Sequence, residues 1–154
     1  MSGIGSVAGT VISISAAQPA TYTVVGYTAL TYTAIGDIDN AGSDGRVYNE
    51  ITFNPIASRG TRKFKGSFNE GNKTLTLAYN SADAGVVLLK TALNSDADFS
   101  FKVALPDGGI RFFQAKVLSF VNEENTVDDM RMATVELTIT TNSAGVGIVE
   151  KLGT

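Results

Sequence analysis

The sequence contains no cysteine, no histidine and no tryptophan, and only three prolines. Without cysteine, disulfides, thiolate nucleophiles and sulfur-ligated metal sites are excluded. Without histidine, the chain lacks the commonest general base and metal ligand, and the usual catalytic triads cannot be assembled. The carboxylate pairs at 123–124 and 128–129 lie in a charge run, where solvation is expected rather than acid–base work. We therefore predict that the protein is not an enzyme and needs no metal or other cofactor.

Charge and hydropathy exclude further classes of partner. The chain has 12 basic and 15 acidic residues, so its net charge of −3 gives no general attraction to nucleic acid or anionic membranes. No apolar run is long enough to span a bilayer, and the first residues lack the basic and apolar regions of a signal peptide. A length of 154 residues fits one domain. We expect an intracellular protein that does not contact a membrane.

Residues 73–121 carry the clearest pattern, a strand followed by a helix and a hairpin. Alternating apolar and polar residues predict four strands here and in the following part of the chain, at 73–79, 99–105, 110–121 and 132–140. The segment Pro106–Gly109 predicts the turn of the hairpin. A change of phase near Val117 indicates either a β-bulge or a strand end buried on both faces. The fold class is therefore mainly β.

The helix is predicted at about residues 82–93 and has a wide apolar arc. Val86 and Leu89 belong to the central apolar stripe, Leu88 lies to one side of it, and Val87 lies on the opposite face. Either other loops of the same chain or a neighbouring chain covers the additional apolar surface. Val87 and Leu88 are therefore candidate subunit-interface residues.

The part of the chain before residue 73 gives weaker signals. The motif Thr-Tyr-Thr-x-x-Gly occurs at 21–26 and at 31–36 and indicates two β-prone pieces. A strand is predicted at 47–53, with Ile51 and Phe53 facing inward, and a hairpin turn at 69–72.

The two ends of the chain are small and weakly polar, yet both keep short strand-forming stretches. Each end is either a disordered tail or an arm that becomes a strand on a partner. We predict an N-terminal arm at 1–20, a single domain at 21–141 and a C-terminal arm at 142–154. The candidate interface residues of the N-terminal arm are Val11, Ile12 and Ile14.

The loop at 37–45 places Asp37, Asp39 and Gly42 at three positions of a calcium-binding EF-hand. Tyr48 stands where the bidentate Glu is needed, and no helix is predicted on either side. We interpret the loop, which also contains Asp44, as mobile and exposed.

A basic cluster surrounds Phe64 and consists of Arg59, Arg62, Lys63 and Lys65. Basic residues around an aromatic ring are found in nucleic-acid sites. They also protect exposed sheet edges. Because the protein is acidic as a whole, we favour a charged edge strand or a charged subunit interface.

The order of these features resembles the major tail tube proteins of long-tailed, siphovirus-type bacteriophages. The resemblance covers about residues 20–140 and is carried by Tyr32–Asp37, Asn49–Phe53, Arg62–Gly66, Thr74–Asn80, Phe101–Gly108, Phe112–Val117 and Val135–Ile139. It implies a β-sandwich or barrel-like fold with one flanking helix. It also implies six copies in a ring, rings stacked into a hollow tube that conducts the genome, and no catalytic residues.

The implied partners are other copies of the chain, the tape measure, tail tip and terminator proteins, and double-stranded DNA that passes without specific binding. The implied location is the tail of the virion, after assembly in the host cytoplasm. The candidate loops between rings contain Asp37, Asp39, Asp44, Arg59 and Arg62. The candidate lumen-facing residues are Asp98, Ser100, Lys102, Gln114 and Lys116.

Lysines facing the lumen would attract DNA, so either acidic residues offset them or they pair across subunits. The competing hypothesis is a monomeric β-sandwich module that binds a glycan or a cell surface, which the absence of tryptophan disfavours.

Overall fold

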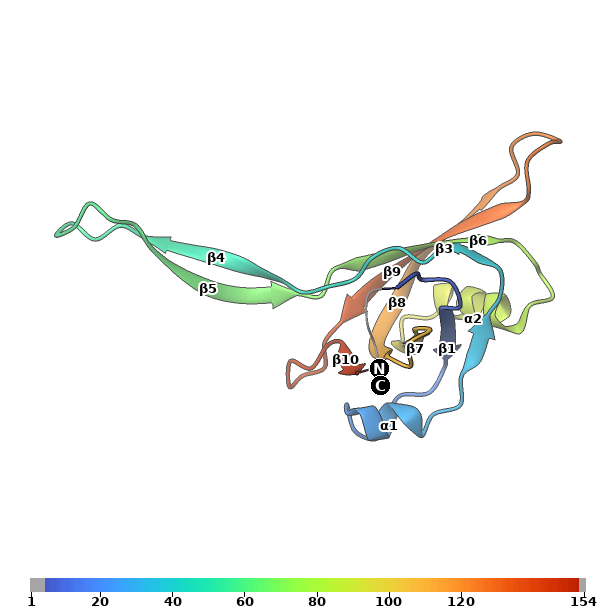
Figure 1. The fold of residues 1–154 in the computed structure, drawn as a ribbon, viewed down its shortest axis with the longest axis horizontal. Helices are drawn as coiled ribbons and strands as arrows, with labels where there is room; N and C mark the ends of the chain where they lie inside the picture. Colours follow the sequence, from blue (N-terminus) through green and yellow to red (C-terminus); the bar gives the residue numbers. More distant parts are fainter. Residues whose placement is uncertain (1–4, 153–154) are drawn as a thin grey trace.

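The computed structural model describes residues 5–152 and shows a curled antiparallel sheet from which a separate two-stranded hairpin projects (Figure 1). The strands are β1 (Val11–Ser15), β2 (Thr33–Ile35), β3 (Ile38–Asn40), β4 (Val47–Phe53), β5 (Arg62–Asn69), β6 (Asn72–Ala78), β7 (Phe99–Ala104), β8 (Ile110–Glu123), β9 (Met132–Thr140) and β10 (Val149–Lys151). The helices are α1 (Val24–Thr28) and α2 (Ala84–Leu93). Neither is long and apolar enough to cross a membrane. The predicted fold class, mainly β with a flanking helix, is confirmed.

The main sheet curls until its two edge strands meet. Its order is β2-β1-β7-β8-β9-β6-β3, and β10 pairs with the first residues of β8. The edge strands β2 and β3 are consecutive in the chain and are separated only by Gly36 and Asp37. Asp37 has a φ of 56°, and its carbonyl accepts a hydrogen bond from the Ala78 amide at 2.9 Å. The sheet is therefore barrel-like, with a gap between β2 and β3.

Helix α2 lies against the gap. The Asp83 side chain caps the helix by accepting from the Val86 amide at 3.3 Å, and it also accepts from the Gly36 amide at 3.1 Å. A Cβ at Gly85 would lie 2.6 Å from the Ala34 carbonyl oxygen, so only glycine permits this close approach of helix and strand. The helix begins at Ala84, two residues later than predicted, because Asp83 serves as its N-cap.

The core fills the inside of the curled sheet and follows the predicted alternation. Leu75 and Leu77 of β6 are fully buried, and the rings of Phe101 and Phe113 stack at 5.5 Å. A register shift between Val117 and Ser119 confirms the bulge that the change of phase in β8 indicated. Burial of these side chains is the main stabilising contribution to the fold.

The repeated motif adopts two different structures. In its first copy Thr23 caps α1 by accepting from the Gly26 amide at 3.3 Å. In its second copy residues 33–35 form β2, which pairs with β1. The prediction of two β-prone pieces was therefore wrong for the first copy, because capping and packing decide the conformation of so short a segment.

The prediction of free arms was wrong for the parts that form β1 and β10. β1 pairs with both β2 and β7, and the side chains of Ile12 and Ile14 are buried in the core of their own subunit. β10 pairs with β8. Neighbours distant in the sequence supply the apolar partners that the ends lack locally, so burial compensates the cost of ordering them. The turn at 69–72 also differs, since β5 pairs with β4 and not with β6.

Candidate functional site: the assembly surfaces

The hairpin of β4 and β5 is the most exposed part of the fold. It extends away from the main sheet, to the left in Figure 1, and every residue of β4 is exposed. Ile51 and Phe53 are about half exposed, at 51% and 53%, so the prediction that they face inward was wrong. A two-stranded hairpin alone is marginally stable in water, so this one requires support beyond its own strand pairing.

The hairpin has one apolar and one polar face. Ile51 lies opposite Phe64 and Phe53 lies opposite Arg62, so these four side chains share a face. The other face is polar and contains Glu50, Thr52, Lys63 and Lys65. Glu50 and Lys63 form an exposed ion pair there at 3.5 Å. No layer of the subunit covers the apolar face, as the exposure of Ile51, Phe53 and Phe64 shows.

Two groups of charged residues hold the base of the hairpin, and the first centres on Asp44. Its carboxylate bonds to the Lys73 ammonium at 3.0 Å and to the Arg111 guanidinium at 3.1 Å. The side chains of Asp44 and Lys73 are only 5% and 3% exposed. The interpretation of Asp44 as part of a mobile, protruding loop was therefore wrong, because its charge is held inside the protein by two partners.

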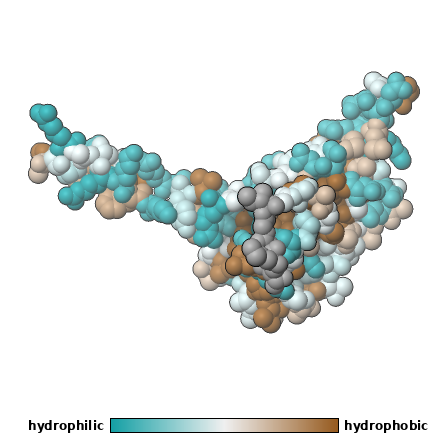
Figure 2. All heavy atoms as spheres, viewed as in Figure 1, coloured by the Kyte–Doolittle hydropathy of each residue, from teal (hydrophilic) through white to brown (hydrophobic). Residues whose placement is uncertain are grey.

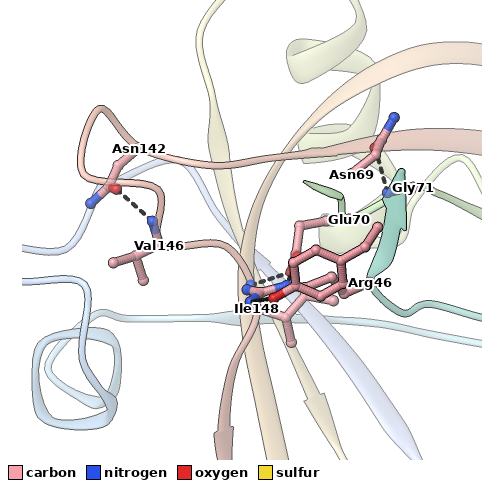
Figure 3. Close-up of polar contacts among 8 residues, drawn as sticks. Arg46, Asn69, Glu70, Gly71, Asn142, Val146 and Ile148 are labelled. Carbon is pink, nitrogen blue, oxygen red and sulfur yellow. Dashed lines mark hydrogen bonds and ion pairs between the residues drawn. The ribbon is translucent and has the colours of Figure 1, made fainter. Parts of the chain in front are cut away.

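Glu70 forms the second group, shown in Figure 3. Its buried carboxylate accepts from Arg46 Nε at 2.5 Å and from the Ile148 amide at 2.8 Å. The hydrogen bond from Glu70 raises the pKa of Arg46 above its ordinary value. A Cβ on Gly147 would lie 2.5 Å from Glu70, so glycine is required for this approach. The hairpin base and the C-terminal segment are thus joined by one buried carboxylate.

The predicted lumen-facing residues lie on the outer face of β7 and β8, and the segment before β2 covers part of that face. Ser100 donates to the Ala17 carbonyl at 2.7 Å and accepts from Gln114 at 2.6 Å, and both side chains are buried. Lys116 pairs with Asp98, and Lys102 lies over the ring of Tyr32 at 5.5 Å. Ser100 and Gln114 therefore cannot line a lumen in this conformation.

Tyr27 of α1 completes the covering layer and stacks on Phe112 with ring centroids 5.3 Å apart. Burial raises the pKa of Tyr27 from 10.0 to about 12, because the phenolate would lose its hydration. Burial likewise raises the pKa of Tyr32. Among the described residues the Tyr27 hydroxyl has no hydrogen-bond partner.

Tyr27→Phe is expected to flatten the loss of stability at alkaline pH. A raised pKa means that the unfolded chain loses its proton first, so the stabilisation is complete below pH 10 and falls as pH rises towards 12. Thermal melts by circular dichroism at pH 8 and pH 11 will show a smaller difference for the variant than for the wild type. Tyr48→Phe, on the exposed hairpin, is the control. Equal differences in all three proteins would contradict the prediction.

A different polar face remains open on β6, β9 and the second half of β8. Its side chains are mostly hydroxyls with a few carboxylates, and none is basic. The residues are Thr74, Thr76, Ser119, Val121, Glu123, Thr134, Glu136, Thr138 and Thr140. Each is half-buried or exposed. The sequence signal for this face was the run of outward threonines in β6 and β9, which simple solvation also explains.

The far end of β8 and β9 forms a second projection, at the upper right of Figure 1. Its exposed apolar residues are Leu118, Val121, Val127 and Met130. Acidic residues stand beside them at positions 123, 124, 128 and 129. Figure 2 shows apolar and hydrophilic residues mixed along both projections.

No family model and no curated protein sequence matches the chain. Solved structures do. A chain of the anti-feeding prophage baseplate aligns with a TM-score of 0.69 and 9% identity, covering 99% of this chain and 98% of that one. The sheath/tube terminator of the PVC extracellular contractile injection system gives 0.65 and 10%, covering 98% and 99%. The SPP1 tail tube gives 0.61 and 15%, covering 94% of this chain and 77% of that one.

The chain has the tail tube fold. The alignments extend over nearly the whole chain, so β1, β10 and the projecting hairpin lie within the compared region. At 9–15% identity the likeness concerns the arrangement of strands and not the side chains. Any role of particular residues must therefore be argued from this chain's own contacts.

Within the tail tube fold, the remaining predicted assembly residues lie at different places. Val87 on α2 is 51% exposed, whereas Leu88 packs against the core. Asp37 and Asp39 are exposed near β3, and Arg59 and Arg62 lie at the outer end of the hairpin. A subunit contact at Val87 stays a prediction. Within residues 5–152, no cluster of three or more carboxylates comes together that could hold a metal ion.

Proposed function

We propose that this protein is a structural subunit that assembles with copies of itself into the tube of a phage tail or a related injection system. The observation that carries the proposal is the tail tube fold over the whole described chain, with a hairpin whose apolar face the subunit leaves uncovered. An apolar face of that kind marks an interaction site. The structural neighbours belong to tubes, baseplates and terminators, which are structural assemblies.

The finer parts of the proposal follow from the resemblance to long-tailed phages. Six copies form a ring, rings stack, and the tube conducts the genome as part of the virion tail after assembly in the host cytoplasm. The tape measure, tail tip and terminator proteins are the further partners. Contractile injection systems are also among the structural neighbours, so assignment to a siphovirus-type tail rests on the sequence resemblance alone.

Assembly in solution tests the proposal. Purified protein will be concentrated stepwise, run on a sizing column and imaged by negative-stain electron microscopy. Rings or tubes are the expected result. A small monomer at every concentration would contradict the proposal and favour the competing hypothesis of a binding module.

A second candidate, an end ring that caps or starts a tube, is favoured by one observation. The terminator and baseplate chains match this one over 98–99% of both lengths, whereas this chain covers 77% of the SPP1 tail tube. An end ring would appear in the micrographs as single or paired rings that do not elongate as the protein concentration rises.

The lumen wall is proposed to be the open face of β6, β9 and the second half of β8. Its hydroxyls and its carboxylates, Glu123 and Glu136, do not attract phosphates, so DNA would pass without being held.

We therefore expect only weak DNA binding by assembled protein, lost as salt is raised. Thr134→Lys combined with Thr138→Lys introduces two cations on this face and should increase retention of double-stranded DNA at low salt. Gel shifts at graded salt will measure both proteins. Tight binding by the wild type at physiological salt would contradict the expectation and direct attention to the basic hairpin.

A further inference from the structure

The two projections of the subunit carry opposite charge. Residues 47–69, here called the basic hairpin, contain four basic residues and one acidic residue: Arg59, Arg62, Lys63 and Lys65 against Glu50. Residues 118–132, here called the acidic end, contain four acidic residues and one basic residue: Glu123, Glu124, Asp128 and Asp129 against Arg131. The chain as a whole is nearly balanced, so this separation of charge is local.

Most of these charges are unmet inside the subunit. Of the five ion pairs among residues 5–152, only that of Lys63 with Glu50 lies in either projection. By contrast, the buried charges at the hairpin base are all paired. Arg59 and Arg62 are exposed, as are Glu124, Asp128 and Asp129.

Each projection also exposes apolar side chains next to its charges. On the basic hairpin Phe53 and Phe64 are 53% and 55% exposed and share a face with Arg62. On the acidic end Val121 is 54% exposed and Met130 is 70% exposed. Phosphates would be attracted by the arginines but would leave these rings in water. Apolar surface beside charge is typical of a contact with another protein.

The positions of the two projections exclude a contact within one subunit. They extend from the body in different directions, β4–β5 to the left and the end of β8–β9 to the upper right of Figure 1. Two complementary surfaces at different places on one molecule make a head-to-tail contact between copies, which repeats into a ring or a filament.

We propose that the apolar face of the basic hairpin of one copy packs against the acidic end of a neighbouring copy. Ile51, Phe53 and Phe64 lose their exposure to water against the apolar residues of that end. Arg59 and Arg62 lie beside its carboxylates, which fixes the register and rejects a like-charged pairing of two hairpins. This contact rests on the proposed function, because it supplies the partner of the uncovered hairpin in the assembled tube.

Charge reversal in pairs tests the contact. One variant carries Arg59→Glu and Arg62→Glu, a second carries Glu124→Lys and Asp128→Lys, and a third combines all four changes. The control reverses two exposed carboxylates away from both projections, Asp96→Lys and Glu150→Lys. Circular dichroism and a sizing column will confirm that each variant is folded. Sedimentation and electron microscopy will give the concentration at which half of the protein is assembled.

Each two-residue variant should raise that concentration about tenfold or more, because like charges then meet across the contact. The four-residue variant should return it to within about threefold of the wild type, and the control should not change it. Normal assembly of either two-residue variant, or no recovery in the four-residue variant, would overturn the contact while leaving the proposed function standing. A wild type that never assembles would overturn both. Normal tubes together with lost DNA binding in the Arg59→Glu, Arg62→Glu variant would show that the hairpin binds a polyanion instead.

Discussion

Replacing both Phe53 and Phe64 with aspartate is expected to leave a folded subunit that forms no rings or tubes. Both rings lie on the apolar face of the hairpin, outside the core, and both are more than half exposed. The subunit therefore loses little burial when they are removed. A neighbouring subunit that packs on this face would instead have to bury two carboxylates without partners, which is costly.

Circular dichroism, thermal melting and negative-stain microscopy of the same preparation measure this prediction. The matched control introduces two carboxylates on the polar face, through Thr52→Asp and Ser67→Asp, and should still assemble. Tubes from the Phe53→Asp, Phe64→Asp variant would place the apolar face in solvent. A variant that fails to fold would show that the hairpin supports the subunit itself, and either result contradicts the prediction.

Asp44→Ala is expected to have the largest effect on the stability of the subunit. It removes the carboxylate that meets both Lys73 and Arg111, and it leaves the Lys73 ammonium buried without a counter-charge. Breaking a buried pair by removing one partner typically costs about 3–5 kcal/mol of the free energy of unfolding. Urea denaturation followed by circular dichroism will measure the loss.

Two comparison variants separate the buried charge from other causes. Asp44→Ala combined with Lys73→Met removes the unpaired charge and should recover much of the lost stability. Glu50→Ala breaks the exposed pair with Lys63, whose side chains are 57% and 66% exposed, and should change stability by no more than about 1 kcal/mol. If Asp44→Ala were no more destabilising than Glu50→Ala, the group at the hairpin base would not hold the subunit together.

The local periodicity of the sequence predicted the strands and helix that form the core. Leu75 and Leu77 alternate with threonines, and Val135 and Leu137 do the same in the partner strand, so the buried faces of β6 and β9 could be derived before any pairing was known. The slip in phase near Val117 predicted the bulge in β8, because an extra residue reverses the facing of all that follow. The absence of cysteine and histidine confined the possible functions to binding and structure.

Tertiary structure alone decided which surfaces are covered. Ile12 and Ile14 form a short apolar stretch with no local partner, and only pairing of β1 with β7 brings them into the core. Ser100 and Gln114 alternate like solvent-facing residues, yet the segment containing α1 packs over them. Ile51 and Phe53 alternate like core residues, yet the subunit gives them nothing to pack against. Periodicity identifies which side chains share a face, but the covering of that face depends on residues distant in the chain or on another copy, whose contacts leave no local pattern.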